Sequence, residues 1–189
     1  MDASDEELIA EYLAGREESF AVLVQRHVKG VYSFIARSVG EEADDIVQET
    51  FFRAWKNLKS YDSAEAKFKT WLMRIARNAT IDYLRKKKPA LFSAFENDEG
   101  ESFLLDTPDT EPLPDELVAR ANDAREVQTV LEGLSPAYRE VLLLRYMNQL
   151  TFEEISAVLG MPANTVRSRH HRGLAQLRKR LQETHQKRK

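Results

Sequence analysis

The stretch TFEEISAVLGMPANTVRSRHHRGLAQL, residues 151–177, decides the fold of the C-terminal part of the chain. Thr151 and Glu154 have the spacing of a capping box, which marks the start of a helix. Gly160 permits a tight turn, and a second helix is predicted over residues 163–183. This layout is typical of a helix-turn-helix, whose second helix enters the major groove of DNA. An ordinary helical hairpin with solvated arginines is the alternative.

Successive residues of the second helix point to different faces, because each is rotated by about 100° from the last. One line of this helix is mainly apolar and is predicted to pack inward: Val166, His170, Leu174, Leu177 and Leu181. The adjacent line is predicted to face DNA, with Arg169 and Arg172 at its edge: Asn164, Arg167, Ser168 and His171. We therefore expect the two adjacent histidines to differ in role. A metal site is not expected, since neither histidine has a second ligand four residues away.

The composition indicates a cytoplasmic, soluble protein. The 189 residues contain no cysteine, which excludes disulfides, thiolate zinc sites and cysteine nucleophiles. The acidic N-terminus does not resemble a secretory signal, and no apolar run approaches the roughly 20 residues that span a bilayer. The net charge of −3 conceals an acidic segment, residues 91–128, and a basic segment, residues 129–189. Such asymmetry suggests that one part of the chain contacts nucleic acid.

Helical periodicity dominates the sequence and predicts an all-α protein. Helices are expected over residues 4–15, 17–38, 43–57, 69–88, 114–134, 136–148, 151–159 and 163–183. Residues 90–113 mix acids, proline, glycine and serine without a sustained period, as linkers do. We therefore predict two small helical domains, residues 1–90 and 114–189, joined by an acidic flexible linker over 91–113.

The stretch EEADDIVQETFFRAW, residues 41–55, places Asp45, Gln48 and Glu49 on one polar helix face. Paired carboxylates can catalyse reactions, but an exposed helix face without a pocket disfavours that role. A protein-binding face is the preferred interpretation, and a merely solvated face is the alternative.

The stretch FKTWLMRIARNATIDYLRKKK, residues 68–88, combines aromatic side chains with a basic helix face. Phe68, Trp71 and also Trp55 could stack on bases, although a single aromatic residue of this kind belongs more often to the core. The basic line indicates contact with a nucleic-acid backbone.

Three segments in order resemble a bacterial sigma factor of the sigma-70 family, extracytoplasmic-function (ECF) subfamily. They are DDIVQETFFRAW (residues 44–55), the stretch over 68–88, and LSPAYREVLLLRYMNQLTFEEISAVLGMPANTVRSRHHRG (residues 134–173). The likeness covers nearly the whole chain, and three ordered motifs are far more specific than a lone helix-turn-helix. The sequence departs from the family pattern at His170, usually apolar, and at Ser156, usually alanine.

The resemblance implies a role for each segment. Asp45, Gln48 and Glu49 would dock on the clamp helices of the largest subunit of core RNA polymerase, and the polymerase flap is a second implied contact. The implied residues for −10 recognition and melting are Tyr61, Asp62, Ser63, Phe68, Trp71, Arg74, Arg77, Asn78 and Arg85. The implied −35 contacts are Thr165, Arg167, Ser168, Arg169, His171 and Arg172.

The predicted function is a dissociable promoter-specificity subunit that traps melted promoter DNA. We expect no catalytic residue, no metal and no cofactor. An anti-sigma factor is a further partner that the resemblance suggests, although no residue of this chain identifies one. The alternative is a stand-alone helix-turn-helix regulator with an N-terminal sensor domain, which predicts a ligand pocket within residues 1–90.

Overall fold

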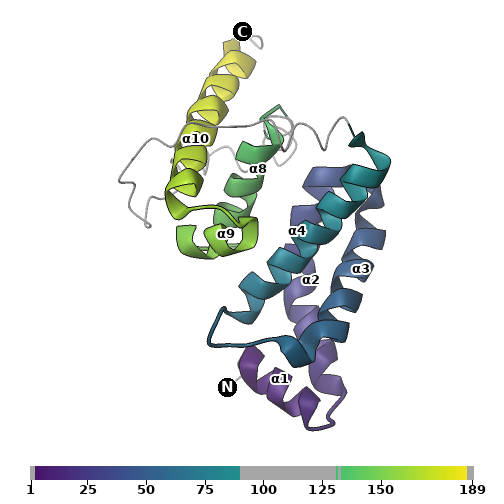
Figure 1. The fold of residues 1–189 in the computed structure, drawn as a ribbon. Coiled ribbons are helices and arrows are strands. Elements are labelled where there is room, and N and C mark those ends of the chain that lie inside the picture. Colours follow the sequence, from purple (N-terminus) through teal and green to yellow (C-terminus); the bar gives the residue numbers. More distant parts are fainter. Residues whose placement is uncertain (1–2, 90–130, 132, 187–189) are drawn as a thin grey trace. The chain divides into compact units, whose positions relative to one another are not determined.

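The computed structural model describes residues 3–89, 131 and 133–186 (Figure 1). The chain divides into two compact units, one over residues 1–89 and one over residues 90–189 apart from Ala157–Leu159. Every regular element in the described part is a helix, which confirms the all-α prediction. The predicted linker, residues 91–113, and most of the helix predicted over 114–134 lie outside the described residues.

The first unit begins with helix α1 (Asp5–Leu13), whose start is fixed by a capping box. The Ser4 hydroxyl accepts a hydrogen bond from the Glu7 backbone N–H, and the Glu7 carboxylate accepts one from the Ser4 N–H. Helix α2 (Glu18–Val39) follows and ends before Gly40, whose φ of 80° favours glycine. Leu8 and Ile9 are buried on α1, which packs against α2.

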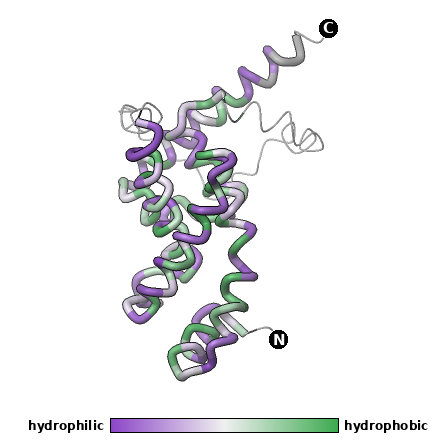
Figure 2. Tube along the Cα trace, turned by 90° about the vertical axis from the view of Figure 1, so that its right-hand side faces the viewer, coloured by the Kyte–Doolittle hydropathy of each residue, from purple (hydrophilic) through white to green (hydrophobic). Residues whose placement is uncertain are grey.

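Helices α3 (Ala43–Asn57) and α4 (Phe68–Lys87) complete this unit, with short 3-10 turns over Gly40–Glu42 and Leu58–Ser60 flanking α3. Helices α2, α3 and α4 pack on one another. Figure 2 shows hydrophobic and hydrophilic residues interleaved along the helices of the chain. The largest fully buried side chains of this core are Leu23, Phe34, Ile35, Leu58, Phe68, Leu72, Met73 and Leu84. Each such side chain contributes about 1.5–3 kcal/mol to folding through burial of apolar surface.

The second unit contains helices α8 (Pro136–Leu142), α9 (Phe152–Leu159) and α10 (Ala163–Gln186). Ser135 caps α8, and proline stands in its first turn. Helix α8 packs along α10, and α9 lies across one end of the pair (Figure 1).

The segment that follows α8 differs from the predicted uniform helix over 136–148. Leu143–Met147 form a π-turn, η3, in which the Asn148 N–H donates to the Leu143 carbonyl. Gln149 then takes a positive φ of 54°, which ends the helical segment before α9. A π-turn inside a helix changes which side chains face a neighbouring element.

Candidate functional surfaces

Helix α3 has one buried face and one exposed face. Ile46, Val47 and Thr50 are buried, and the Thr50 hydroxyl donates to the Ile46 carbonyl. Asp45, Gln48 and Glu49 are all exposed on the other side of the helix. The structure therefore brings these three side chains together on one accessible surface, where they can bind another protein.

An ion-pair network joins this surface to helix α4. Arg53 contacts the Glu49 carboxylate at 2.6 Å and the Asp82 carboxylate at 2.9 Å. These two acids raise the pKa of Arg53. The network borders a surface groove of about 270 Å³ that Asp45 and Lys86 also line. Sequence reasoning missed the role of Arg53 and the groove, because the Arg53–Asp82 contact joins residues of different helices.

The loop over residues 61–67 connects α3 to α4 and is closed by contacts of its own residues. The Tyr61 hydroxyl donates to the Ala66 carbonyl at 3.0 Å, and the Asp62 carboxylate accepts from the Ala64 N–H at 2.8 Å. Burial, followed by the nearby Glu6 carboxylate, raises the pKa of Tyr61 to about 12. The Tyr61 hydroxyl therefore remains a hydrogen-bond donor at physiological pH, while Asp62 and Ser63 stay exposed.

An aromatic cluster lies beneath this loop. Tyr61 contacts Phe68 and Trp71, with ring centroids 5.7 Å and 5.4 Å apart, and His27 meets Phe68 edge-on at 5.4 Å. Phe68 is 1% exposed and Trp71 is 9% exposed. The two rings therefore pack inside the unit and support the loop, which favours the core alternative over base stacking.

Trp55 is the third aromatic residue for which base stacking was considered. It lies on α3, is about half exposed, and its Nε1–H donates to the Tyr12 hydroxyl at 2.6 Å. Its ring contacts Phe52 on the same helix. Trp55 therefore belongs to the exposed side of α3 and not to the loop over 61–67.

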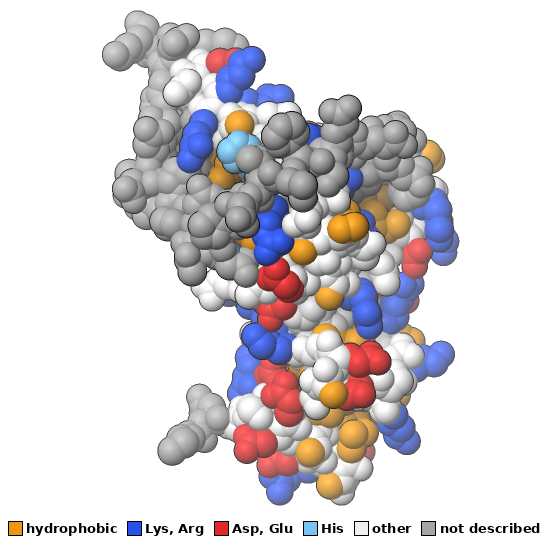
Figure 3. Space-filling model, turned by 60° about the vertical axis from the view of Figure 1, so that its left-hand side comes forward, with side chains coloured by type: hydrophobic (Ala, Val, Ile, Leu, Met, Phe, Trp, Pro, Cys, Tyr) orange, Lys and Arg blue, Asp and Glu red, His pale blue; other side chains and the backbone are white. Residues whose placement is uncertain are grey.

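Helix α4 presents a polar and basic line to its surroundings. Arg74, Asn78 and Arg85 are exposed at steps of four and seven residues, and Arg77 beside them is half-buried. Arg85 pairs with Asp82 at 3.0 Å. Acidic and basic side chains are interspersed over the face drawn in Figure 3. The local charge around each candidate DNA contact therefore depends on its immediate neighbours.

The turn between α9 and α10 has the geometry that the sequence predicts. Thr151 and Glu154 form both hydrogen bonds of a capping box, and Gly160 takes the left-handed conformation with a φ of 67°. The Ser156 hydroxyl donates to the Met161 carbonyl across the turn. Serine in place of the usual alanine thus adds a contact at the turn.

The first turns of α10 hold the predicted −35 residues. His171 is exposed, Thr165 is half-buried, and Arg167 pairs with Glu153 at 2.6 Å. The Arg167 guanidinium also lies over the Phe152 ring, 5.4 Å from its centroid. These contacts orient Arg167 along the surface that α9 and α10 share.

The remaining predicted −35 residues differ in exposure. Arg169 and Arg172 are half-buried. Ser168 is 2% exposed, so the prediction that it lies on an exposed line with Arg167 and His171 is wrong. The periodicity of one helix identifies its main packing face, but it does not show what covers the flank.

His170 lies in the packing face, as predicted. Its ring is fully buried, meets the Phe152 ring edge-on at 5.1 Å, and forms a hydrogen bond of 2.8 Å through Nε2 with the Tyr146 hydroxyl. Burial, followed by electrostatic repulsion from Arg145 and His171, lowers the pKa of His170 to about 4. His170 is therefore neutral at physiological pH, and a neutral imidazole nitrogen can accept the Tyr146 O–H.

Among the described residues, no group of three or more histidine, cysteine or acidic side chains could hold a metal ion. In the same part of the chain, no helix is long and apolar enough to cross a membrane.

Comparison with known families assigns both units. Residues 23–89 match the model for sigma-70 region 2, and residues 124–177 match the model for sigma-70 region 4. The region 2 match contains the α3 surface, the loop over 61–67 and α4, and the region 4 match contains the first turns of α10.

Individual relatives agree over most of the chain. The ECF RNA polymerase sigma factor SigW of Bacillus subtilis is 37% identical over 173 residues, which cover 89% of this chain and 92% of SigW. The ECF RNA polymerase sigma-E factor of Haemophilus influenzae is 30% identical over 188 residues, which cover 95% and 96% of the two chains. The solved structure of CnrH in complex with the cytosolic domain of CnrY has a TM-score of 0.66 and 29% identity, and it covers 96% of this chain and 99% of CnrH.

These matches confirm the resemblance inferred from the three sequence motifs. They also set aside the alternative of a stand-alone regulator, because sigma-factor relatives align along almost the full chain. The chain belongs to the extracytoplasmic-function sigma factors of the sigma-70 family, which are not enzymes but RNA polymerase subunits that direct transcription initiation.

Proposed function

We propose that this sigma factor divides promoter recognition between its two units. The exposed face of α3 binds core polymerase, the loop over 61–67 with α4 opens and holds the −10 element, and α10 reads the −35 element. The observation that carries the proposal is the position of these surfaces: the first two lie within the region 2 match, and α10 enters the region 4 match.

The polymerase-binding role is supported by the chemistry of α3. Asp45, Gln48 and Glu49 form one accessible polar surface, and the Arg53 network extends it to α4. Such a surface suits a basic partner helix, since complementary charges steer encounter and fix the register of docking. The clamp helices of the largest polymerase subunit are the proposed partner.

The −10 role is supported by the loop over 61–67 and the exposed line on α4. Asp62 and Ser63 are accessible at the tip of a loop whose shape is fixed by Tyr61. An unpaired base can enter such a loop and be recognised by its edge. Arg74 and Arg85 then contact the phosphates of the same strand, so that trapping melted DNA needs no nucleotide hydrolysis.

The −35 role is supported by the presentation of α10 after a tight turn. Thr165, Arg167 and His171 are accessible near the start of the helix, where a helix-turn-helix contacts base edges. Arg169 and Arg172 are the proposed phosphate or edge contacts. Ser168 is not retained as a base contact because its side chain is buried.

The two units act together in the cytoplasm, as the domains over residues 1–90 and 114–189 joined by the acidic segment over 91–113. Each DNA contact supplies modest affinity, and tethering converts the second binding event into an intramolecular one. The acidic segment suits a basic path through the polymerase.

An anti-sigma factor is the further partner that we propose. The solved structure of CnrH contains the cytosolic domain of CnrY, and CnrH resembles this chain over nearly its full length. A protein that covers the α3 surface would compete with core polymerase.

Run-off transcription tests the proposal directly. Core polymerase is incubated with a pool of genomic promoters, with and without the full-length protein. We expect new transcripts that depend on the protein and start a fixed distance from shared −35 and −10 sequences. Equal transcript sets in both reactions would contradict the proposal.

Charge reversal at α3 tests the polymerase surface separately. The double variant Asp45→Lys and Glu49→Lys should abolish binding to core polymerase in a pull-down or titration, while the circular dichroism spectrum stays unchanged. The matched control reverses Glu17 and Glu18, which are exposed at the start of α2. If both double variants bind polymerase equally well, the α3 surface is not the docking site.

A further inference from the structure

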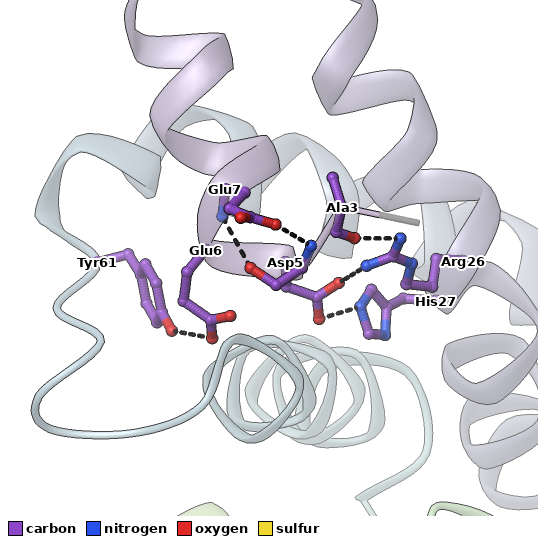
Figure 4. Close-up of polar contacts among 8 residues, drawn as sticks. Ala3, Asp5, Glu6, Glu7, Arg26, His27 and Tyr61 are labelled. Carbon is purple, nitrogen blue, oxygen red and sulfur yellow. Dashed lines mark hydrogen bonds and ion pairs between the residues drawn. The ribbon is translucent and has the colours of Figure 1, made fainter. Parts of the chain in front are cut away.

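The start of helix α1 makes a dense set of polar contacts with the neighbouring helix α2 (Figure 4). The Asp5 carboxylate contacts Arg26 at 2.6 Å through one oxygen and His27 Nε2 at 2.7 Å through the other. The Ala3 carbonyl accepts a second hydrogen bond from Arg26 at 2.8 Å. These residues of α1 precede the segment that matches region 2, which begins at residue 23.

Asp5 is well shielded for a charged side chain. Its side chain is 17% exposed, and that of His27 is 10% exposed. A carboxylate removed from water in this way requires hydrogen-bond partners, and short charge-assisted bonds of this kind are the stronger ones. The contact therefore fixes the His27 ring and not only the start of α1.

The His27 ring connects Asp5 to the loop over 61–67. His27 meets Phe68 edge-on, and Phe68 meets Tyr61 at an interplanar angle of 86°. Tyr61 in turn closes the loop through its bond to the Ala66 carbonyl. A continuous set of contacts thus runs from the first turn of α1 to the loop.

A second contact joins α1 to the loop directly. The Tyr61 hydroxyl lies 3.5 Å from a carboxylate oxygen of Glu6, and Figure 4 shows these two side chains facing each other. The same first turn of α1 therefore contacts the loop through Glu6 and supports it from behind through Asp5.

We propose that Asp5 is a positioning residue for capture of the melted −10 base. It acts through His27, Phe68 and Tyr61 and does not touch DNA. The inference rests on the proposed role of the loop over 61–67 in base capture. It adds the first turn of α1, which precedes the matched region 2 segment, to the machinery of promoter melting.

Pre-organisation gives the physical reason. A loop that is already held in its receptive shape loses less conformational freedom when a base enters, and binding is correspondingly tighter. Without Asp5 the His27 ring loses its carboxylate partner, and the Phe68 and Tyr61 rings above it gain freedom. The loop then loses more conformational entropy when it captures a base, and the base binds more weakly.

The experiment measures base capture with the holoenzyme formed from core polymerase and the full chain. Fork-junction promoter DNA is used with an intact single-stranded non-template −10 segment, or with an abasic site at each −10 position in turn. The ratio of dissociation constants, abasic over intact, reports how much each base contributes. At the most sensitive position, Asp5→Ala should lower this ratio by about three- to tenfold.

Two further variants separate positioning from a general loss of structure. Glu11→Ala is the matched control, because Glu11 accepts from Ser19 at 2.6 Å and contacts Arg16 at 2.8 Å at the other end of α1. It should leave the ratio unchanged. Asp5→Asn keeps an oxygen acceptor without the charge and should give an intermediate ratio.

The outcomes distinguish the inference from the proposed function. If the wild-type holoenzyme initiates transcription but Asp5→Ala leaves the ratio unchanged, the positioning role is overturned and the loop keeps its function. Equal losses in Asp5→Ala and Glu11→Ala would overturn the positioning role in favour of a general effect on α1. If no −10 position of the wild type responds to an abasic site, base capture by the loop and the role of Asp5 both fall.

Discussion

The two units each place a histidine inside an aromatic cluster, yet the clusters differ in the charge of the groups around the histidine. His27 lies under the loop over 61–67, beside Phe68, and contacts the carboxylate of Asp5. Its cluster is connected to another helix by an ion pair.

His170 lies behind the start of α10, beside Phe152, and its polar partner is the uncharged Tyr146 hydroxyl. Burial opposes protonation of His170, and so do the neighbouring side chains of Arg145 and His171. The comparison teaches that one residue type can fill two different roles: His27 of α2 joins a carboxylate to an aromatic ring, and His170 of the helix-turn-helix replaces an apolar core residue.

The largest expected effect comes from removing the aromatic centre of one cluster. Phe152→Ala should lower the unfolding free energy of the second unit by about 3–5 kcal/mol, because a large buried ring leaves a cavity. Phe68→Ala should do the same in the first unit. Hydrogen exchange of the backbone amides, measured helix by helix, checks whether each loss stays in its own unit. If either variant lowered the protection of both units equally, the prediction that each cluster stabilises only its own unit would be contradicted.

A second prediction compares the DNA contacts of the two units. Arg172→Ala should weaken binding to −35 duplex DNA by about 1–3 kcal/mol if Arg172 reads a base, and should relax sequence choice there. Arg74→Ala should instead weaken binding to a −10 fork junction. Both are measured by titration of the holoenzyme at one salt concentration. Unchanged −35 sequence choice in Arg172→Ala would remove Arg172 from the base-reading residues.

The third prediction concerns the neutral histidine. The pKa of His170 is lowered to about 4 in the folded state, so the unfolded chain binds its proton first as pH falls. Stability is therefore complete above the unfolded pKa of about 6.5 and is lost as pH falls from there towards about 4. Relative to His170→Leu, the wild type should lose about 2 kcal/mol between about pH 7.5 and about pH 5.

Denaturant unfolding of both proteins at the two pH values checks this difference. The leucine variant is the control for the wild type, since the two proteins share all other titrating groups. An equal stability difference between the two proteins at both pH values would contradict the neutral, buried state of His170.

The smallest expected effects come from the two capping boxes. Thr151→Ala and Ser4→Ala should each cost about 1 kcal/mol, because each leaves a helix N–H without its side-chain acceptor. Thermal unfolding measures both. Only Ser4→Ala should also lower base discrimination at −10, since α1 supports the loop over 61–67. Equal discrimination losses in the two variants would remove that distinction.

Local features of this fold could be predicted from the sequence. Both capping boxes, the turn at Gly160 and the inward position of His170 depend on residues within a few positions of one another. Their signals are steric and hydrogen-bonding preferences of a single helix or turn. The all-α class follows from the same short-range periodicity.

The rest depends on contacts between distant segments. Asp5 and His27 are 22 positions apart, and Glu6 and Tyr61 are 55 apart, so no local pattern indicates their pairing. Phe68 and Trp71 also show the limit, because an aromatic ring beside a basic line fits either a base stack or a core until packing is known. The helical period alone predicted an exposed Ser168, but its side chain is buried.

The π-turn over Leu143–Met147 has a consequence for chain length. It accommodates one residue more than an α-helical path between the same ends would hold. Deleting one residue there would let a regular α-helix join the same ends, so the side chains on either side would keep the faces they present. In a regular helix the same deletion would rotate every later side chain by about 100° about the helix axis. The segment over Leu143–Met147 should therefore tolerate a single-residue deletion better than the regular helices beside it.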